Sequence, residues 1–98
     1  MARFDVHRLR DGAFVVDCQA EFLRNIGTRL VIPLLPRGEG PAPNERINPV
    51  IDFHGEPLVL LTQLAGSIRT SELQQRLGSV GHEDLRITSA IDVLTGTA

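Results

Sequence analysis

The sequence predicts a mainly β fold, a partly open antiparallel barrel of about five or more strands that ends in one C-terminal α-helix. Three observations predict it. Short apolar runs alternate with polar residues and are separated by glycine, proline and asparagine. The run at residues 28–35 is almost entirely apolar. Only the last segment spaces its apolar residues as a helix does.

The first two strands are expected at residues 4–7 and 14–19, where apolar and polar side chains alternate. The pair Asp11 and Gly12 between them is typical of a hairpin turn, because glycine adopts positive φ without strain. Residues 20–27 are polar but carry several apolar side chains. We interpret them as a loop that keeps these side chains for a contact.

The apolar run "TRLVIPLL", residues 28–35, is rich in β-branched residues and predicts a strand covered on both faces. Its Pro33 cannot donate a hydrogen bond to a neighbouring strand, so this strand is expected at a sheet edge or with a bulge. Residues 36–46 contain several prolines and glycines and few apolar residues, which indicates a surface loop.

A second hairpin is expected around "HGE", residues 54–56, with its second strand ending before Gly66. Residues 67–80 are compatible with a helix or with an extended segment. After Gly81 the spacing predicts a helix of about three turns that carries acidic residues in its first turn. Its apolar face is formed by Ile87, Ala90, Ile91 and Leu94. Gly96 should end it.

Length and composition predict one domain, residues 1–98, in the cytoplasm. The formal net charge is −2, and all the basic residues are arginines scattered along the chain. This argues against the basic surface that non-specific nucleic-acid binding requires. There is no signal-like leader and no apolar run long enough to span a bilayer.

Metal and thiol chemistry have little support in the sequence. His7, His54 and His82 lie on different predicted elements, without a second ligand at helical spacing. We expect them to be surface residues beside turns. Cys18 is the one cysteine, so it forms no internal disulfide, and burial on a strand should raise its pKa. We therefore predict no metal, no cofactor and no catalytic cysteine.

Acid and base cleavage of RNA stays open as an alternative. It requires a cation, a base and an acid that converge in a groove, and Arg29, His54 and Arg69 could supply them. Charged residues beside strands are more often solvated strand ends. The apolar residues Phe22, Leu23 and Ile26, like those of the last helix, are either core or interface.

The stretches "FVVDCQAEFLRNIGTRLVIPL" and "NPVIDFHGEPLVLLTQLAGSI", with "AIDV" in the last helix, resemble the CcdB family of bacterial toxins. The most specific part is "VIPL" with the upstream Asp-x-Gln. The resemblance implies an SH3-like barrel, a fold shared with the MazF ribonucleases, and a homodimer. It further implies a protein that is not an enzyme, that inhibits DNA gyrase through its A subunit and that an antitoxin of the CcdA type neutralises.

The resemblance also implies roles for individual residues. The predicted contacts with the target are Phe22, Leu23, Asp92, Thr95, Gly96, Thr97 and Ala98. The predicted dimer interface is Ile87, Ile91 and Leu94. The family ends in Phe-Trp-Gly-Ile, and none of the last four residues here is kept. Because tryptophan is a typical interface hot spot, this loss should weaken binding to the target by several powers of ten.

Three interpretations therefore remain. The first is a CcdB-type toxin that binds gyrase. The second is a module of the same fold that only binds its antitoxin. The third is an endoribonuclease that resembles MazF.

Overall fold

Antiparallel strands and one C-terminal helix build the fold, as the sequence predicts. The computed structural model describes residues 2–40 and 43–97. In this part of the chain the strands are β1 Asp5–Arg8, β2 Phe14–Asp17, β3 Thr28–Pro36, β4 Val50–Phe53, β5 Glu56–Leu60, β6 Gly66–Arg69 and β7 Arg76–Ser79. The short 3-10 helices are η1 Glu21–Leu23, η2 Thr62–Leu64, η3 Thr70–Glu72 and η4 Gly81–Glu83. The helix α1 is Asp84–Thr95.

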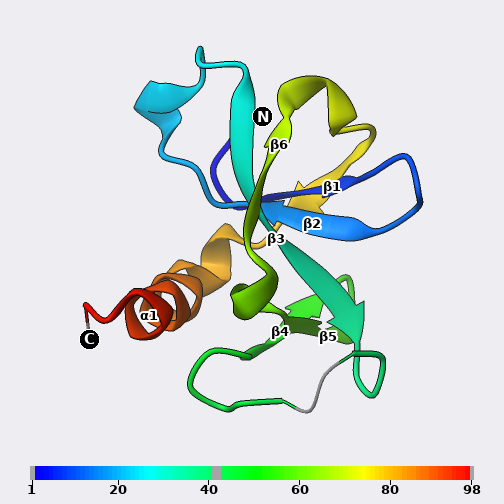
Figure 1. Ribbon diagram of the computed structural model, residues 1–98. Coiled ribbons are helices and arrows are strands. Elements are labelled where there is room, and N and C mark those ends of the chain that lie inside the picture. The colour runs from blue at the N-terminus through cyan, green and yellow to red at the C-terminus, as the bar shows by residue number, and fades with distance from the viewer. Residues whose placement is uncertain (1, 41–42, 98) are drawn as a thin grey trace.

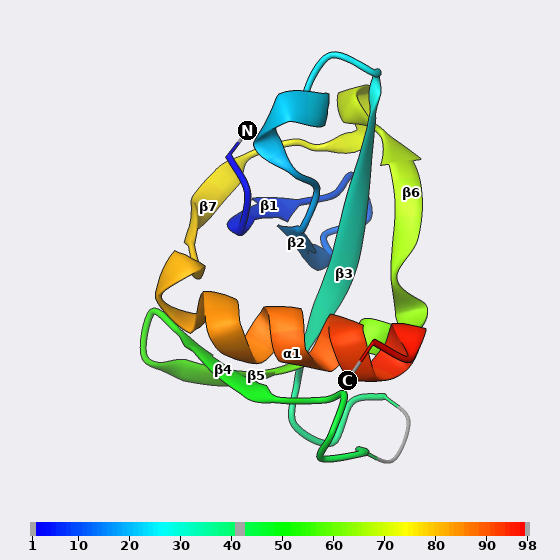
Figure 2. The ribbon, with the colours of Figure 1, turned by 90° about the vertical axis from the view of Figure 1, so that its left-hand side faces the viewer.

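The strands form one curled sheet in the order β4-β5-β3-β2-β1-β7, and β6 pairs with β3 beside this path. The long strand β3 is the centre of the sheet, because it pairs with β2, with β5 and with β6. Figure 1 shows the sheet curling around this strand, and Figure 2 shows α1 lying across the open side. The result is a half-barrel closed by a helix.

The prediction that Pro33 places its strand at an edge or at a bulge is wrong: Pro33 pairs in regular register with Val15, and β3 has partners on both sides. The pairing with β6 ends at Val31, and the pairing with β5 begins at Leu34. Pro33 lies between the two partners, where its carbonyl oxygen accepts a hydrogen bond from the Leu61 N–H at 2.9 Å. Its missing N–H therefore falls where β3 changes neighbours, so no regular ladder bond is lost.

The predicted hairpins are confirmed. Strands β1 and β2 pair with Val6 opposite Val16, and Gly12 in the turn has φ of +89°. The second hairpin joins β4 and β5, although β5 is shorter than predicted because η2 follows it. Within residues 67–80, which the sequence leaves ambiguous, the chain forms the end of β6, then η3 and β7.

One hydrophobic core fills the space between the sheet and α1. Its buried members are Phe4, Val6, Val16, Cys18, Ile32, Leu34, Ile51, Phe53, Leu58, Leu60, Val80 and Ile87. The helix contributes Ile87 and Ala90, Ile91 packs half-buried against the core, and Leu94 is 43% exposed. At the predicted end Gly96 has φ of +81°, and the Thr97 N–H donates to the Asp92 carbonyl at 2.8 Å. No helix in residues 2–40 and 43–97 has the length and hydropathy to cross a bilayer.

Candidate functional site

The turn between β4 and β5 exposes a histidine at its tip. Phe53 pairs with Glu56, so His54 and Gly55 form a two-residue turn with φ of +53° and +83°. Positive φ at both positions is the signature of a type I′ hairpin turn. A residue with a Cβ in this conformation costs roughly 1–2 kcal/mol. The fold thus places a histidine at a position whose backbone conformation glycine or asparagine would adopt with less strain.

Aromatic contacts fix the position of this imidazole. The His54 ring stacks on Phe53 with ring centroids 4.0 Å apart and an interplanar angle of 18°. Phe53 contacts the edge of Phe14 at 6.5 Å between centroids. The guanidinium carbon of Arg8 lies 5.5 Å from the centroid of Phe14. A continuous series of contacts therefore joins the turn to the ends of β1 and β2.

These residues surround a surface cavity of about 370 Å³, which we call the His54 hollow. Its lining residues are Arg8, Phe14, Phe53, His54, Glu56 and Leu77. Arg8, His54 and Glu56 are exposed to solvent. The hollow therefore combines a permanent cation, a carboxylate and an imidazole with two aromatic rings. Imidazole and carboxylate can exchange protons with a bound substrate, and a guanidinium can stabilise negative charge on a phosphate.

Gly78 of β7 leaves room for the stacked rings. It has φ of +153°, and a Cβ there would lie 3.0 Å from His54 Nε2 and 3.1 Å from Phe53 Cε1. We expect Gly78→Ala to lower the free energy of unfolding by about 1–3 kcal/mol and to shift the NMR signals of the His54 ring. Urea unfolding measures the first effect. Gly66→Ala is the control, because it has an ordinary φ and its nearest neighbour would lie at 4.0 Å; equal losses in both variants would contradict the prediction.

The structure does not assemble the three residues that the sequence suggests for RNA cleavage. His54 lines the hollow, but Arg29 and Arg69 do not. Arg69 is exposed on β6 opposite Thr28. Arg29 is 0% exposed, so its interpretation as a solvated strand end is wrong. The residues that sequence reasoning missed are Arg8 and Glu56, which only the meeting of β1 with the second hairpin reveals.

Arg29 belongs to a buried ion pair instead. Its Nε–H donates to Asp17 Oδ2 at 2.7 Å, and its Nη2 lies 2.7 Å from the same oxygen. Both side chains are 0% exposed. The other oxygen of Asp17 accepts from the Gln19 N–H at 3.1 Å. Buried charges are tolerated when they are paired and hydrogen-bonded, and this pair joins β2 to β3.

Gln19 explains the rest of the Asp-x-Gln motif. Its side-chain NH₂ donates to the Leu23 carbonyl at 2.9 Å, and its side-chain oxygen accepts from the Leu30 N–H at 3.1 Å. It thereby ties the loop that contains η1 to β3. The motif on which the family resemblance rests most strongly is a structural link in this fold.

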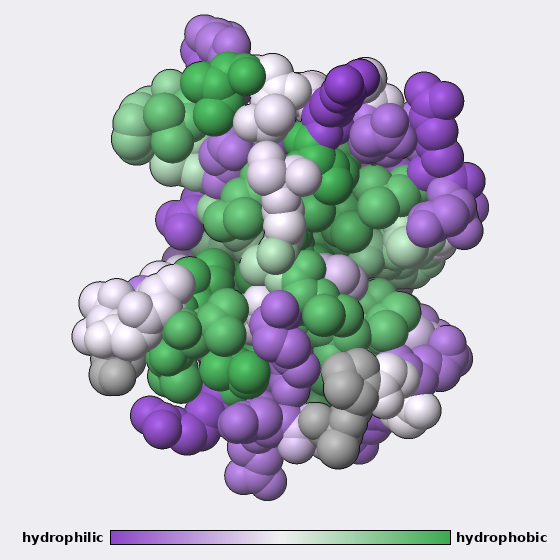
Figure 3. All heavy atoms as spheres, viewed as in Figure 1, coloured by the Kyte–Doolittle hydropathy of each residue, from purple (hydrophilic) through white to green (hydrophobic). Residues whose placement is uncertain are grey.

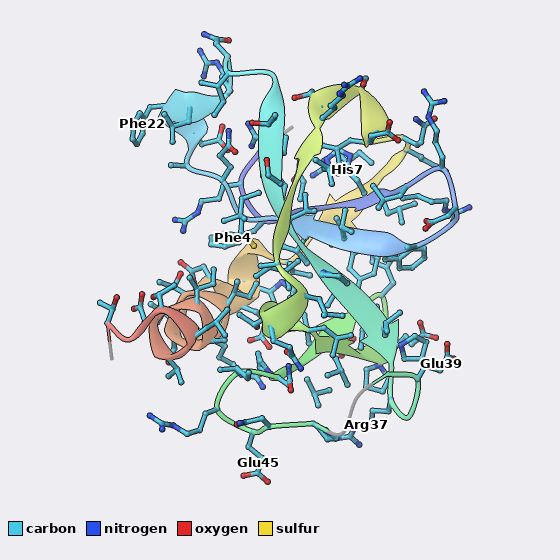
Figure 4. All side chains as sticks on the ribbon, in the orientation of Figure 1. Phe4, His7, Phe22, Arg37, Glu39 and Glu45 are labelled. Carbon is cyan, nitrogen blue, oxygen red and sulfur yellow. The ribbon has the colours of Figure 1, made fainter. Side chains whose placement is uncertain are left out.

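His7 is also buried, at 4% exposure, so its prediction as a surface residue is wrong, whereas His54 and His82 are exposed. Figure 4 shows His7 inside the fold. Burial lowers the pKa of His7, although the charges of Asp5 and Asp17 oppose the shift. Burial alone would raise the pKa of Asp5, but hydrogen bonds from Arg76 and the Ala2 N–H lower it. Arg76 Nε lies 3.0 Å from Asp5 Oδ2.

We expect stability to fall as the pH drops below about 6.5, the usual pKa of histidine. In that range His7 becomes protonated in the unfolded chain but stays neutral in the folded chain, because its folded pKa is lower. Protonation therefore favours unfolding. Asp5 adds a second loss at more acidic pH, below the usual carboxyl range, because its folded pKa is lowered. Urea midpoints at several pH values measure this. His7→Leu should make stability less dependent on pH near 6.5, and His7→Gln replaces it if that variant does not fold. The control His82→Gln should leave this pH dependence as it is. An unchanged pH dependence in the His7 variants contradicts its assignment to His7.

Cys18 lies in the core and does not line the His54 hollow. Burial raises the pKa of the Cys18 thiol to about 12, as expected for a thiol in the core. Within the part of the chain that the structure describes, His, Cys, Asp and Glu form no group of three or more that could hold a metal ion.

The predicted target contacts lie in two places. Phe22 is 83% exposed, and Leu23 and Ile26 are exposed beside it; Figure 4 shows Phe22 pointing away from the sheet. The tail residues 95–97 are exposed next to half-buried Asp92, and Ala98 lies outside the described residues. Figure 3 shows apolar side chains around η1 and around the end of α1, with a notch between them. Of the predicted dimer residues, Ile87 is fully buried within its own chain.

A curled half-barrel with a C-terminal helix is a fold of toxins from toxin–antitoxin pairs, and solved structures share it. An endoribonuclease in complex with its cognate antitoxin, from Mycobacterial species, has a TM-score of 0.84 at 13% identity and covers 100% of this chain and 97% of its own. An endoribonuclease from Mycobacterial species has a TM-score of 0.78 at 14% identity, covering 98% of this chain and 91% of its own. The Mycobacterium tuberculosis toxin MazF-mt6 has a TM-score of 0.78 at 16% identity, with 96% and 98% covered.

The family model of the CcdB protein matches residues 3–96. This chain therefore belongs to the CcdB family, as its motifs predict. No curated protein matches the sequence.

The prediction that the protein is not an enzyme is overturned. Two of the solved structures with this fold are endoribonucleases. The prediction relied on the gyrase-binding members of the family and on the absence of a catalytic motif along the chain. A set of residues that converges only in three dimensions, like that of the His54 hollow, leaves no such motif.

Proposed function

We propose that this protein is the toxin of a toxin–antitoxin pair and that it cleaves single-stranded RNA at the His54 hollow. Family membership supports the first part. The observation that carries the second is the convergence of Arg8, His54 and Glu56 in one hollow, on a fold that solved endoribonucleases also adopt. Aromatic side chains such as Phe14 provide surfaces on which unpaired bases stack.

The three polar residues can divide the chemistry of RNA cleavage among them. The Glu56 carboxylate accepts the proton of a ribose 2′-hydroxyl, whose oxygen attacks the neighbouring phosphorus. The bond from phosphorus to the 5′-oxygen breaks, and the His54 imidazolium donates a proton to that oxygen. The Arg8 guanidinium stabilises the negative charge that develops on the phosphate oxygens. The products are a 2′,3′-cyclic phosphate and a 5′-hydroxyl.

An assay with the purified chain tests this proposal. A single-stranded RNA should be cleaved to products with these two ends, and a 2′-deoxy nucleotide at the cleaved position should block the reaction. Cleavage that persists with the 2′-deoxy nucleotide would overturn the mechanism. Absence of any cleavage, across RNAs that together contain all dinucleotides, would overturn the function.

The proposed partners are a second copy of the chain and an antitoxin of the CcdA type. The complex of a similar fold with its cognate antitoxin supports the antitoxin. The exposed apolar side chains of Phe22, Leu23 and Leu94 support protein contacts, since isolated monomers bury most such groups. Co-expression with the product of the neighbouring reading frame, followed by copurification and sedimentation, tests both partners. A chain that remains monomeric and unbound contradicts them.

A second candidate function is binding to the A subunit of DNA gyrase. The observation that favours it is Phe22, which is 83% exposed on the loop held by Gln19. Capture of the purified A subunit, lost on Phe22→Ala, would support it. Growth arrest separates the two functions, because arrest by RNA cleavage should persist in cells with a resistant gyrase. Healthy growth in cells with sensitive gyrase and in cells with resistant gyrase would contradict both functions. The interpretation that remains is a module that only binds its antitoxin.

A further inference from the structure

A second hollow adjoins the His54 hollow. It has a volume of about 280 Å³, and we call it the Glu39 hollow. Its lining residues are Gly12, Ala13, Phe14, Leu34, Leu35, Pro36, Glu39, Glu56 and Leu58. Phe14 and Glu56 line both hollows. A ligand bound in one can therefore extend into the other past these two side chains.

The two hollows differ in charge. The His54 hollow contains Arg8 and His54 as well as Glu56, which both hollows share. The charged residues that line the Glu39 hollow are Glu39 and Glu56, and both are acidic. Ionised carboxylates only accept hydrogen bonds, and they repel a phosphate at short range. A nucleotide whose phosphate lies beside Arg8 would therefore gain most from placing a group rich in N–H donors beside Glu39.

The apolar walls of the Glu39 hollow suit the flat face of an aromatic ring. Its apolar lining consists of Leu34, Leu35 and Pro36 from β3, Leu58 from β5, and Ala13 and Phe14 from the first hairpin. Glu39 itself lies in a tight turn after β3, where its N–H donates to the Pro36 carbonyl at 3.1 Å and Gly38 has φ of +85°. The turn therefore fixes the backbone of Glu39 beside the hollow that its side chain lines.

We propose that the Glu39 hollow selects a nucleobase by its N–H donors, and that guanine is the preferred base. Guanine presents N1–H and N2–H side by side, which matches the two oxygens of one carboxylate. Uracil presents a single N–H between two carbonyl oxygens, and these would face the carboxylates. The inference rests on the proposed function, because the base is that of the RNA nucleotide whose phosphate occupies the His54 hollow.

Nucleotide binding to the full chain tests the inference without requiring cleavage. In NMR titrations, guanosine 5′-monophosphate should bind about tenfold more tightly than uridine 5′-monophosphate, as expected for one good bidentate contact. The largest shifts should fall on Phe14 and Leu35. Glu39→Gln should reduce the preference to near unity. Glu45→Gln is the control, because it removes the same charge at a residue that lines neither hollow. Figure 4 shows Glu39 and Glu45 apart from each other.

The outcomes separate this inference from the proposed function. Guanine-selective binding that Glu39→Gln abolishes supports the inference, even if no RNA is cleaved. RNA cleavage without a base preference, or with a preference that Glu39→Gln leaves intact, overturns the inference and keeps the function. Equal binding of the two nucleotides also overturns it. If Glu45→Gln reduces the preference for guanine as much as Glu39→Gln does, the preference depends on overall charge. That result also overturns the inference.

Discussion

Replacement of His54 is expected to lower kcat for RNA cleavage by about 10²–10⁴-fold, the usual contribution of a positioned general acid. The best variant is His54→Asn, because asparagine tolerates positive φ and keeps the turn while removing the proton donor. The expected loss lies in kcat and not in KM, since Arg8 and the aromatic rings still bind the substrate. Single-turnover cleavage of a labelled RNA measures it.

Two controls make this result specific. His82→Asn changes an exposed histidine on another element, and it should leave kcat unchanged. The melting temperature of His54→Asn should stay near that of the parent chain, because the turn is retained. If His54→Asn cleaves RNA at the parent rate, the histidine is not the acid, and the proposed site is wrong.

Arg29→Met is expected to lower the free energy of unfolding by about 3–5 kcal/mol, because it leaves the Asp17 carboxylate buried without its partner. Total stabilities are roughly 5–15 kcal/mol for a domain, so the chain would be close to unfolded at 37 °C. Arg69→Met, on the adjacent strand β6 and exposed, should stay within about 0.5 kcal/mol. Urea unfolding at neutral pH measures both.

A double variant keeps this prediction testable if Arg29→Met does not fold. Asp17→Leu combined with Arg29→Met replaces both charges with apolar groups, and such replacements recover much of the stability lost by the single change. The double variant should therefore be more stable than Arg29→Met alone. A double variant that is less stable than the single one contradicts the account of Asp17 as a buried carboxylate that depends on Arg29 for its charge partner.

Local features of the fold could be read from the sequence. The turn at Asp11 and Gly12 and the end of α1 at Gly96 depend on the residues next to them, so spacing and glycine were sufficient. Pro33 misled because a proline is tolerated there only where the pairing of β3 passes from β6 to β5. That position is a property of the whole sheet and cannot be read from the neighbouring residues. His7 misled for a similar reason, since its strand β1 pairs with β7, which is distant in sequence.

The candidate site was predictable only in part. His54 stood out as a histidine in a turn, and Glu56 lies in the same hairpin, but Arg8, Phe14 and Leu77 come from β1, β2 and β7. Spacing along the chain cannot show that Gly78 leaves room for the His54 ring, or that Arg8 lies over Phe14. In contrast, Asp17 and Arg29 could have been paired from register, because both point to the same face of neighbouring strands.

The position of β3 has a consequence for how the chain folds and opens. It pairs with the preceding strand β2 and also with β5 and β6, which lie beyond the surface loop and β4, so part of its ladder closes long loops. Such topologies fold slowly compared with helical bundles. Once formed, an amide of β3 is released only when several ladders open together, so hydrogen exchange there should require global unfolding, while the loop around Phe22 should exchange through local opening. The loop around Phe22, which is exposed to a partner, is thus the part of the molecule that can change conformation at the lowest free-energy cost.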